Sequence, residues 1–390
     1  MINPYTFYCI GFLVALVLYA LGWSDAYPGI TVPLGAFIMI TLLAHFALAR
    51  YWARLKQPRF QKINASFNPV IITYFIYCLW IAEFIYQGIP LLNILLSRPY
   101  NHNLFGIPAL HVFIVTFSSF YTQYLFHLYL SDRKKLVLVL YFINLFAAVL
   151  IFSRSMLFFN VTGSFFLYLF SLEKIPYRKL LLLIPISIAG FYLFGVIGNR
   201  RMAFQTKLPY NANYFLITGK ASDKFRQSAI PKEFFWSYIY ISSPIANLQA
   251  NILYNQIPPI TLSRVLLYVN NEFLFESISK RINSLAGVER EKEITIKHPF
   301  NVSTVYSRSY SYIGWSGIIV MGIFVLILPL AYQKILPQNS AYSLTGYAVL
   351  CTMYLFMVYD NTIRLMALGF QLVYPFALPV AERLLKRVSA

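Results

Sequence analysis

The chain has 390 residues, of which 59% are hydrophobic and only 12% are charged, and its formal net charge is +19. An ordinary soluble domain carries about 25% charged residues, so this composition excludes that class. Basic cytoplasmic loops of a multi-pass membrane protein explain the positive charge better than nucleic-acid binding does, since the sequence has no RNA- or DNA-binding motif.

Apolar runs of about 18 to 22 residues recur along the chain, which is the length a helix needs to cross a bilayer. Ten spans are predicted, at 4–23, 30–49, 67–87, 109–130, 136–153, 155–172, 180–198, 312–332, 341–359 and 362–380. The sequence therefore predicts an all-α polytopic integral membrane protein. It is organised as an N-terminal bundle of about seven helices (1–198), a large loop (199–311) and C-terminal helices (312–390).

Basic residues follow every second predicted span. They are Arg50, Arg54, Lys56, Arg59 and Lys62, then Arg133, Lys134 and Lys135, then Lys174, Arg178 and Lys179, then Lys334, and finally Arg383, Lys386 and Arg387. Short cytoplasmic loops carry the excess of Lys and Arg in membrane proteins. We therefore expect both termini in the cytoplasm and the 199–311 loop on the outer side.

The long loop contains three distinct stretches. KEFFWSYIYISSPIANLQANIL is apolar and aromatic and predicts a re-entrant or interfacial helix. LSRVLLYVNNEFLFESISKRI has helix-period apolar residues and predicts one amphipathic helix. SLAGVEREKEITIKH is charged, and we expect it to be exposed.

Charged residues gather at the outer ends of the predicted spans. They are Glu83, Arg154, Arg200, Arg201, Arg308, Asp360 and Arg364. A cationic layer at this depth can hold a phosphate or diphosphate, because arginine offers two parallel donors to phosphate oxygens. Simpler structural roles stay open: Arg200 and Arg201 as interfacial anchors, and Glu83 with Gln87 or Asp360 with Arg364 as local i, i+4 pairs.

Further candidates lie within the long loop and along two spans. His298 and Asn301 flank the HPFN turn, and the aromatic residues Trp236, Tyr238 and Tyr240 could stack on sugars or belong to an interfacial belt. Polar stripes that predict packing between helices are Thr116, Ser119, Gln123 and His127 on one span and Asn160, Ser164 and Ser171 on another. No nucleotide or metal motif occurs, so no cofactor is expected.

Three stretches resemble the Wzy-type O-antigen polymerases, also called oligosaccharide repeat unit polymerases. They are FSRSMLFF between two spans, YIYISSPIANLQANI in the long loop and FNVSTVYSRSYSYIGWSGIIVMG before a late span. The layout is also similar, with a GT-C-like set of membrane helices and one large helical periplasmic loop. The O-antigen ligases share much of this pattern, but here the histidine and asparagine are separated in HPFN, which favours the polymerase.

The resemblance implies that the protein joins undecaprenyl-diphosphate-linked oligosaccharides at the periplasmic face of the bacterial inner membrane. Donor and acceptor are both lipid-linked, and a chain-length regulator protein is a further candidate partner. On this reading Arg154 and Arg200 contact the diphosphate, with Arg201 and Arg308 in support, and Glu83 or His298 accepts the acceptor proton. Asp360, Arg364, Asn301, Trp236 and Tyr240 complete the expected substrate site. The alternatives are an O-antigen ligase and a flippase for lipid-linked sugars.

Overall fold

The computed structural model describes residues 2–52, 54, 59–96, 98, 105–172, 181–206, 209–296, 300–337 and 340–388. This part of the chain is helical, and its only β pairing is an isolated bridge between Ser24 and Ala221. The helices of the N-terminal half are α1 (Pro4–Ala20), α2 (Val32–Trp52), α3 (Pro69–Gln87), α4 (Pro90–Leu95), α5 (Leu110–Asp132), α6 (Lys135–Leu150), α7 (Arg154–Phe170) and α9 (Leu183–Thr206).

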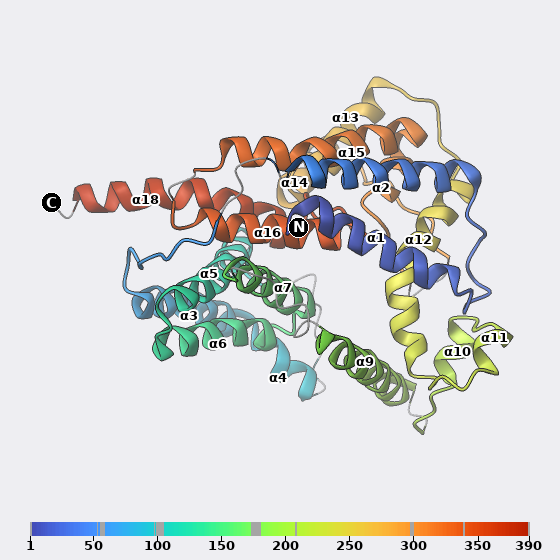
Figure 1. Ribbon diagram of the computed structural model, residues 1–390, viewed down its shortest axis with the longest axis horizontal. Coiled ribbons are helices and arrows are strands. Elements are labelled where there is room, and N and C mark those ends of the chain that lie inside the picture. Colours follow the sequence, from blue (N-terminus) through green and yellow to red (C-terminus); the bar gives the residue numbers. More distant parts are fainter. Residues whose placement is uncertain are drawn as a thin grey trace.

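The second half contains shorter helices before the last long ones. They are α10 (Tyr214–Thr218), α11 (Asp223–Arg226), α12 (Phe234–Tyr254), α13 (Leu262–Phe273), α14 (Glu276–Ala286), α15 (Ser307–Ile335), α16 (Ser343–Phe356), α17 (Met366–Gly369), the 3₁₀ turn η2 (Phe370–Val373) and α18 (Tyr374–Val388). Most long helices run along the long axis of the molecule, whereas α12 crosses them near one end, beside α10 and α11 (Figure 1). The C-terminus lies at the opposite end (Figure 1).

Three helical stretches are long and apolar enough to cross a membrane: Val32–Trp52, Pro69–Leu95 and Ser307–Ile335. The second contains α3 and α4, which a bend at Gly88 separates. Shorter apolar helices are α1, α6 and α16. The chain is therefore a helical protein with the features of a membrane protein.

Local sequence explains where several helices begin. The side chains of Asn3 and Asn68 accept hydrogen bonds from the amides of Thr6 (2.9 Å) and Val70 (3.0 Å), and a proline follows each cap. Ser153 caps α7 in the same way by accepting from Met156 N at 3.4 Å. Such caps accept hydrogen bonds from amides that have no partner within the helix. The start of each of these helices is therefore determined by a short local sequence pattern.

The polar stripe on α5 packs against other helices, as predicted. Gln123 Nε2 donates to Asn160 Oδ1 on α7 (3.4 Å) and to Gln371 Oε1 on η2 (3.2 Å). A Cβ on Gly163 would lie 1.9 Å from Gln123 Oε1, so the glycine leaves the space that this side chain fills. The stripe therefore joins α5, α7 and η2 inside the bundle.

Three expectations for the second half are corrected. The stretch expected as one amphipathic helix forms two, α13 and α14, since the chain is extended at Leu274 and Phe275 between them. The predicted span at 362–380 has no helix before Met366, because residues 361–365 form a turn held by side-chain contacts described below. The stretch expected to be exposed is half-buried at Glu291 and Glu293, where both carboxylates pair with arginines.

Helix α15 is broken near its N-terminal end. Ile313 and Gly314 have non-helical backbone angles, and Gly314 has a φ of 63°, which favours glycine. Helix α13 satisfies the carbonyls around the break. Arg264 donates to the oxygens of Tyr312 and Ser311, both at 3.0 Å, and Tyr268 OH donates to Gly317 O at 2.9 Å.

Candidate functional site

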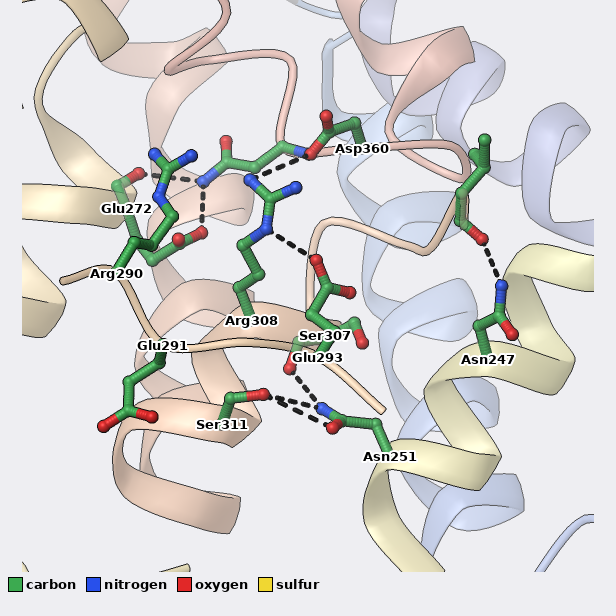
Figure 2. Close-up of polar contacts among 12 residues, drawn as sticks. Asn247, Asn251, Glu272, Arg290, Glu291, Glu293, Ser307, Arg308, Ser311 and Asp360 are labelled. Carbon is green, nitrogen blue, oxygen red and sulfur yellow. Dashed lines mark hydrogen bonds and ion pairs between the residues drawn. The ribbon is translucent and has the colours of Figure 1, made fainter. Parts of the chain in front are cut away.

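Seven charged side chains from five segments meet beside the start of α15, and we name this group the arginine–carboxylate cluster. Its members are Glu272 on α13, Glu276 on α14, Arg290 and Glu293 in the following segment, Arg308 on α15, and Asp360 and Arg364 in the turn before α17. Figure 2 shows five of them, Glu272, Arg290, Glu293, Arg308 and Asp360, facing one another. Residues 92 positions apart in the chain thus form one polar site.

Asp360 lies between two arginines. Arg364 Nη2 donates to both of its oxygens, at 3.2 and 3.4 Å, and Arg308 Nη1 lies 3.8 Å from Oδ1. Arg308 Nε also contacts Glu293 Oε1 at 2.5 Å, while Arg364 Nη1 lies 3.9 Å from Glu276 Oε2. Only 2% of the Arg364 side chain is exposed, against 33% for Asp360, so the carboxylate is the more accessible member of this pair.

Asn361 fixes the turn that carries Asp360 and Arg364. Its backbone amide donates to Asp360 Oδ1 at 2.7 Å, and its Nδ2 donates to the backbone oxygen (2.8 Å) and to Oε2 (3.0 Å) of Glu272. The amide of Glu276 in turn donates to Arg364 O at 3.0 Å. These bonds attach the turn to α13 and α14, which explains why no helix forms before Met366.

Two asparagines of α12 hold the other side of the cluster (Figure 2). Asn247 Nδ2 donates to Phe300 O (2.8 Å) and Val302 O (2.7 Å), and its Oδ1 accepts from Ile296 N (2.9 Å). Asn251 Oδ1 accepts from Ile294 N at 3.0 Å, and its Nδ2 donates to Ser307 O at 2.8 Å. We name this pair the asparagine clamp. It fixes the backbone just after Glu293 and just before Arg308.

Burial shifts the protonation of two carboxyl groups in the cluster. Glu272 is fully buried, and the loss of hydration raises its pKa to about 8, although Arg308 opposes this. Burial also raises the pKa of Asp360 to about 6, again against Arg308. Near neutral pH the cluster therefore holds a neutral carboxylic acid and an ionised carboxylate within one hydrogen-bonded network.

Several buried polar atoms in the cluster form no hydrogen bond with the residues described here, although Arg308 Nη1 and Arg364 Nη1 each lie within 4 Å of a carboxylate oxygen. Arg308 Nη1, Arg290 Nη2, and Nε and Nη1 of Arg364 are buried and form no hydrogen bond within the described residues. Glu272 Oε1 is likewise buried without a partner there. Buried polar atoms normally have partners, so these groups are suited to receive a polar or anionic ligand.

The structure brings some predicted site residues together and leaves others apart. Arg308, Asp360 and Arg364 converge, and the Asp360–Arg364 pair expected from its i, i+4 spacing is present. Arg154, at the first position of α7, and Arg200 on α9 are exposed, and neither forms an ion pair in the part of the chain described here. Asn301 is exposed too, and His298 lies outside the described residues.

The predicted sugar-stacking aromatics take part in packing. Trp236 is buried, stacks on Phe215 with ring centroids 3.5 Å apart and donates to Asn199 Oδ1 at 2.6 Å. Arg201 lies over its ring at 5.9 Å. Tyr240 is 46% exposed and meets Phe194 edge to face. Of these aromatics Tyr240 has the ring area available to a ligand.

Glu83 belongs to a second polar site. Its fully buried carboxylate lies 2.8 Å from His111 Nδ1, at the start of α5, and accepts from Ile107 N at 3.1 Å. The expected partner Gln87 accepts from Gly106 N at 2.6 Å. Both side chains of α3 thus hold the segment that leads into α5.

Five ionisable residues of these sites were not predicted from the sequence. Glu272, Glu276, Arg290 and Glu293 lie in stretches that were assigned to an amphipathic helix and an exposed segment, and His111 was not considered. A local signal exists for His111, because it begins a predicted span directly after a turn with Gly106 and Pro108. Glu272 and Glu293 show no such signal, since their partners are more than ten residues away.

A cavity of about 410 Å³ lies elsewhere in the molecule. Its lining includes Ser66, Tyr342, Glu382 and Arg383, and none of the predicted site residues. The arginine–carboxylate cluster is therefore identified by its side-chain chemistry and not by its volume.

Comparison with known proteins gives no match: no protein-family model, no curated protein and no solved structure corresponds to this chain.

Proposed function

We propose that the protein polymerises lipid-linked oligosaccharides, with a lipid diphosphate as leaving group, as in the Wzy-type polymerases that three of its sequence stretches resemble. One observation carries this proposal. Arg308 and Arg364 converge on Asp360 and retain guanidinium nitrogens without hydrogen bonds among the described residues. Such donors match the oxygens of a diphosphate.

The proposed reaction forms one bond and breaks another. The acceptor sugar hydroxyl attacks the anomeric carbon of the donor, and the bond from that carbon to the diphosphate oxygen breaks with its electron pair. The hydroxyl proton passes to a base. Arginines placed where the charge develops lower the barrier. Arg308 and Arg364 supply this in the cluster.

We further propose that the chain crosses the bacterial inner membrane about ten times, in a GT-C-like arrangement with both termini in the cytoplasm. Each predicted span but the one at 362–380 falls mostly on one helix of at least 14 residues, and the exposed side chains of α2, α3, α6 and α9 are mostly apolar, as a lipid-facing surface requires. The arginine–carboxylate cluster then lies on the periplasmic side.

The first test is the lipopolysaccharide profile of cells that lack the protein. A single repeat unit on the core, with the ladder absent, supports the polymerase. Bare core with lipid-linked polymer accumulating would point to a ligase. Bare core with single units retained inside the cell would point to a flippase.

A matched pair of arginine variants tests the site. Arg308→Lys keeps the charge but removes the planar pair of donors, so we expect the ladder to be lost or shortened at normal protein levels. Arg281→Lys changes an exposed arginine on α14 and should leave the ladder intact. A normal ladder with Arg308→Lys would contradict the role of the cluster.

A further inference from the structure

Glu83 is too deeply buried to meet a substrate itself. It lies on α3, within a stretch that is able to cross a membrane, and its side chain has no exposed surface. An ionisable residue at such a position is expensive and usually has a functional partner. Its partner here is His111, whose side chain is 28% exposed. A molecule that approaches from outside the protein can therefore contact the imidazole of His111 but not the carboxylate of Glu83.

The chain around His111 is held in an uncommon conformation. Ala109, the residue before α5, has a φ of 67°, and Gly106 has a φ of 101°. A Cβ on Gly106 would lie 2.4 Å from Cγ of His111, so the backbone passes directly against the ring. Non-glycine residues at positive φ persist where the surroundings impose them, which is common at functional sites.

Glu83 also determines which ring nitrogen of His111 is free. With Glu83 Oε2 as the acceptor, Nδ1, 2.8 Å away, is the donor of this hydrogen bond. In the neutral ring the lone pair is then on Nε2. The rings of Trp80 and Phe105 meet the imidazole edge to face, at centroid distances of 6.1 and 5.4 Å, and fix its plane.

Helix α5 packs against the segment that directly follows the arginine–carboxylate cluster in the chain. His111 is the second residue of α5, and α17, which begins two residues after Arg364, packs against the same helix. A hydrogen bond of 2.8 Å between Thr116 and Tyr374 also links α5 to α18.

We propose that His111 accepts the proton from the acceptor sugar hydroxyl through Nε2, and that Glu83 is the positioning residue that orients its ring. The proposal rests on the proposed function, because that reaction supplies the proton. As the hydroxyl oxygen bonds to the anomeric carbon, the proton passes to Nε2 and the diphosphate departs with the electron pair of the broken bond.

The test uses the purified full chain and the lipid-linked repeat units that accumulate in cells lacking it. His111→Asn retains an N–H donor for Glu83 but has no basic nitrogen, and we expect a loss of polymerisation rate of about 100-fold or more. Glu83→Gln should lower kcat by about 10- to 100-fold with little change in KM. With His111→Ala, added imidazole should restore activity, whereas the similarly shaped but weakly basic pyrazole should not.

The outcomes separate the inference from the function on which it rests. If the unaltered chain forms no polymer from these units, the proposed function fails. If it forms polymer and His111→Asn stays within about twofold of its rate, His111 is only structural and the inference alone is overturned. Equal rescue of His111→Ala by imidazole and pyrazole, or no rescue by either, would also overturn it.

Discussion

The buried carboxyl group of Glu272, in the arginine–carboxylate cluster, makes the stability of the folded protein depend on pH. Its side chain is fully buried, and Arg308, Arg290, Asp360 and Asn361 are the charged and polar groups that act on it. Removing water raises its pKa from 4.5 to about 8, so the native protein keeps a proton that the unfolded chain has already released. Between these values, stability must fall as pH rises.

Glu272→Gln should remove much of this pH dependence. The amide cannot ionise, so the drop in thermal midpoint between pH 5 and pH 8 should be smaller than in the unaltered protein by about 2 °C or more. Some slope remains, because Asp360 has a pKa raised in the same direction, to about 6. Thermal unfolding of the purified protein at the two pH values measures the effect. Equal drops in both proteins would show that Glu272 is ionised in the native state.

At the residue scale, spacing along the chain predicted only the local contacts. Asp360 and Arg364 are four residues apart, and their ion pair follows from that spacing. The contact between Arg308 and Glu293 joins a helix to a segment that was expected to be exposed, so it depends on tertiary packing. The same is true of Glu83 and His111, which are 28 residues apart on different helices.

The asparagine clamp shows how one helix organises the outer segment. Asn247 and Asn251 are one turn apart on α12, so their side chains share a face. Together they hold backbone groups between Ile294 and Ser307, a stretch that directly follows Glu293 and directly precedes Arg308. Helix α12 was predicted from its apolar composition, but the partners of its asparagines were not.

Asn247→Leu should release this stretch without removing α12. It leaves two carbonyls and the amide of Ile296 without their present partner, at a cost of about 1–3 kcal/mol for each buried group. We expect faster hydrogen exchange in peptides that cover 290–296. Leu253→Ala, on the exposed face of the same helix, is the control and should leave that exchange unchanged. Unchanged exchange with Asn247→Leu would mean that other contacts hold the segment.

At the scale of the whole molecule, the orientation that we propose in the membrane rests on the distribution of basic residues. Arg133 and Lys134 lie between α5 and α6, Lys135 begins α6, and Lys134 is largely exposed. Lys292 is exposed in the segment between α14 and α15. The proposed topology places these two groups on opposite sides of the bilayer.

Single cysteines introduced at these positions test that topology. In a variant without Cys9, Cys78 and Cys351, Lys292→Cys should react with a membrane-impermeant maleimide applied to cells whose outer membrane is opened. Lys134→Cys should react only after the inner membrane is also permeabilised. The reverse pattern would overturn the orientation, and with it the periplasmic position of the arginine–carboxylate cluster.

The break in α15 has a consequence for how the molecule unfolds. It leaves helix carbonyls near the end of a stretch that is able to cross a membrane, and Arg264 and Tyr268 of α13 donate to three of them. In an apolar environment each unpaired carbonyl costs several kcal/mol, so α13 cannot leave α15 without a large penalty. The outer segment and the last membrane helices should therefore melt as one cooperative unit. A chain cut between them would yield two fragments, neither of which is stable alone.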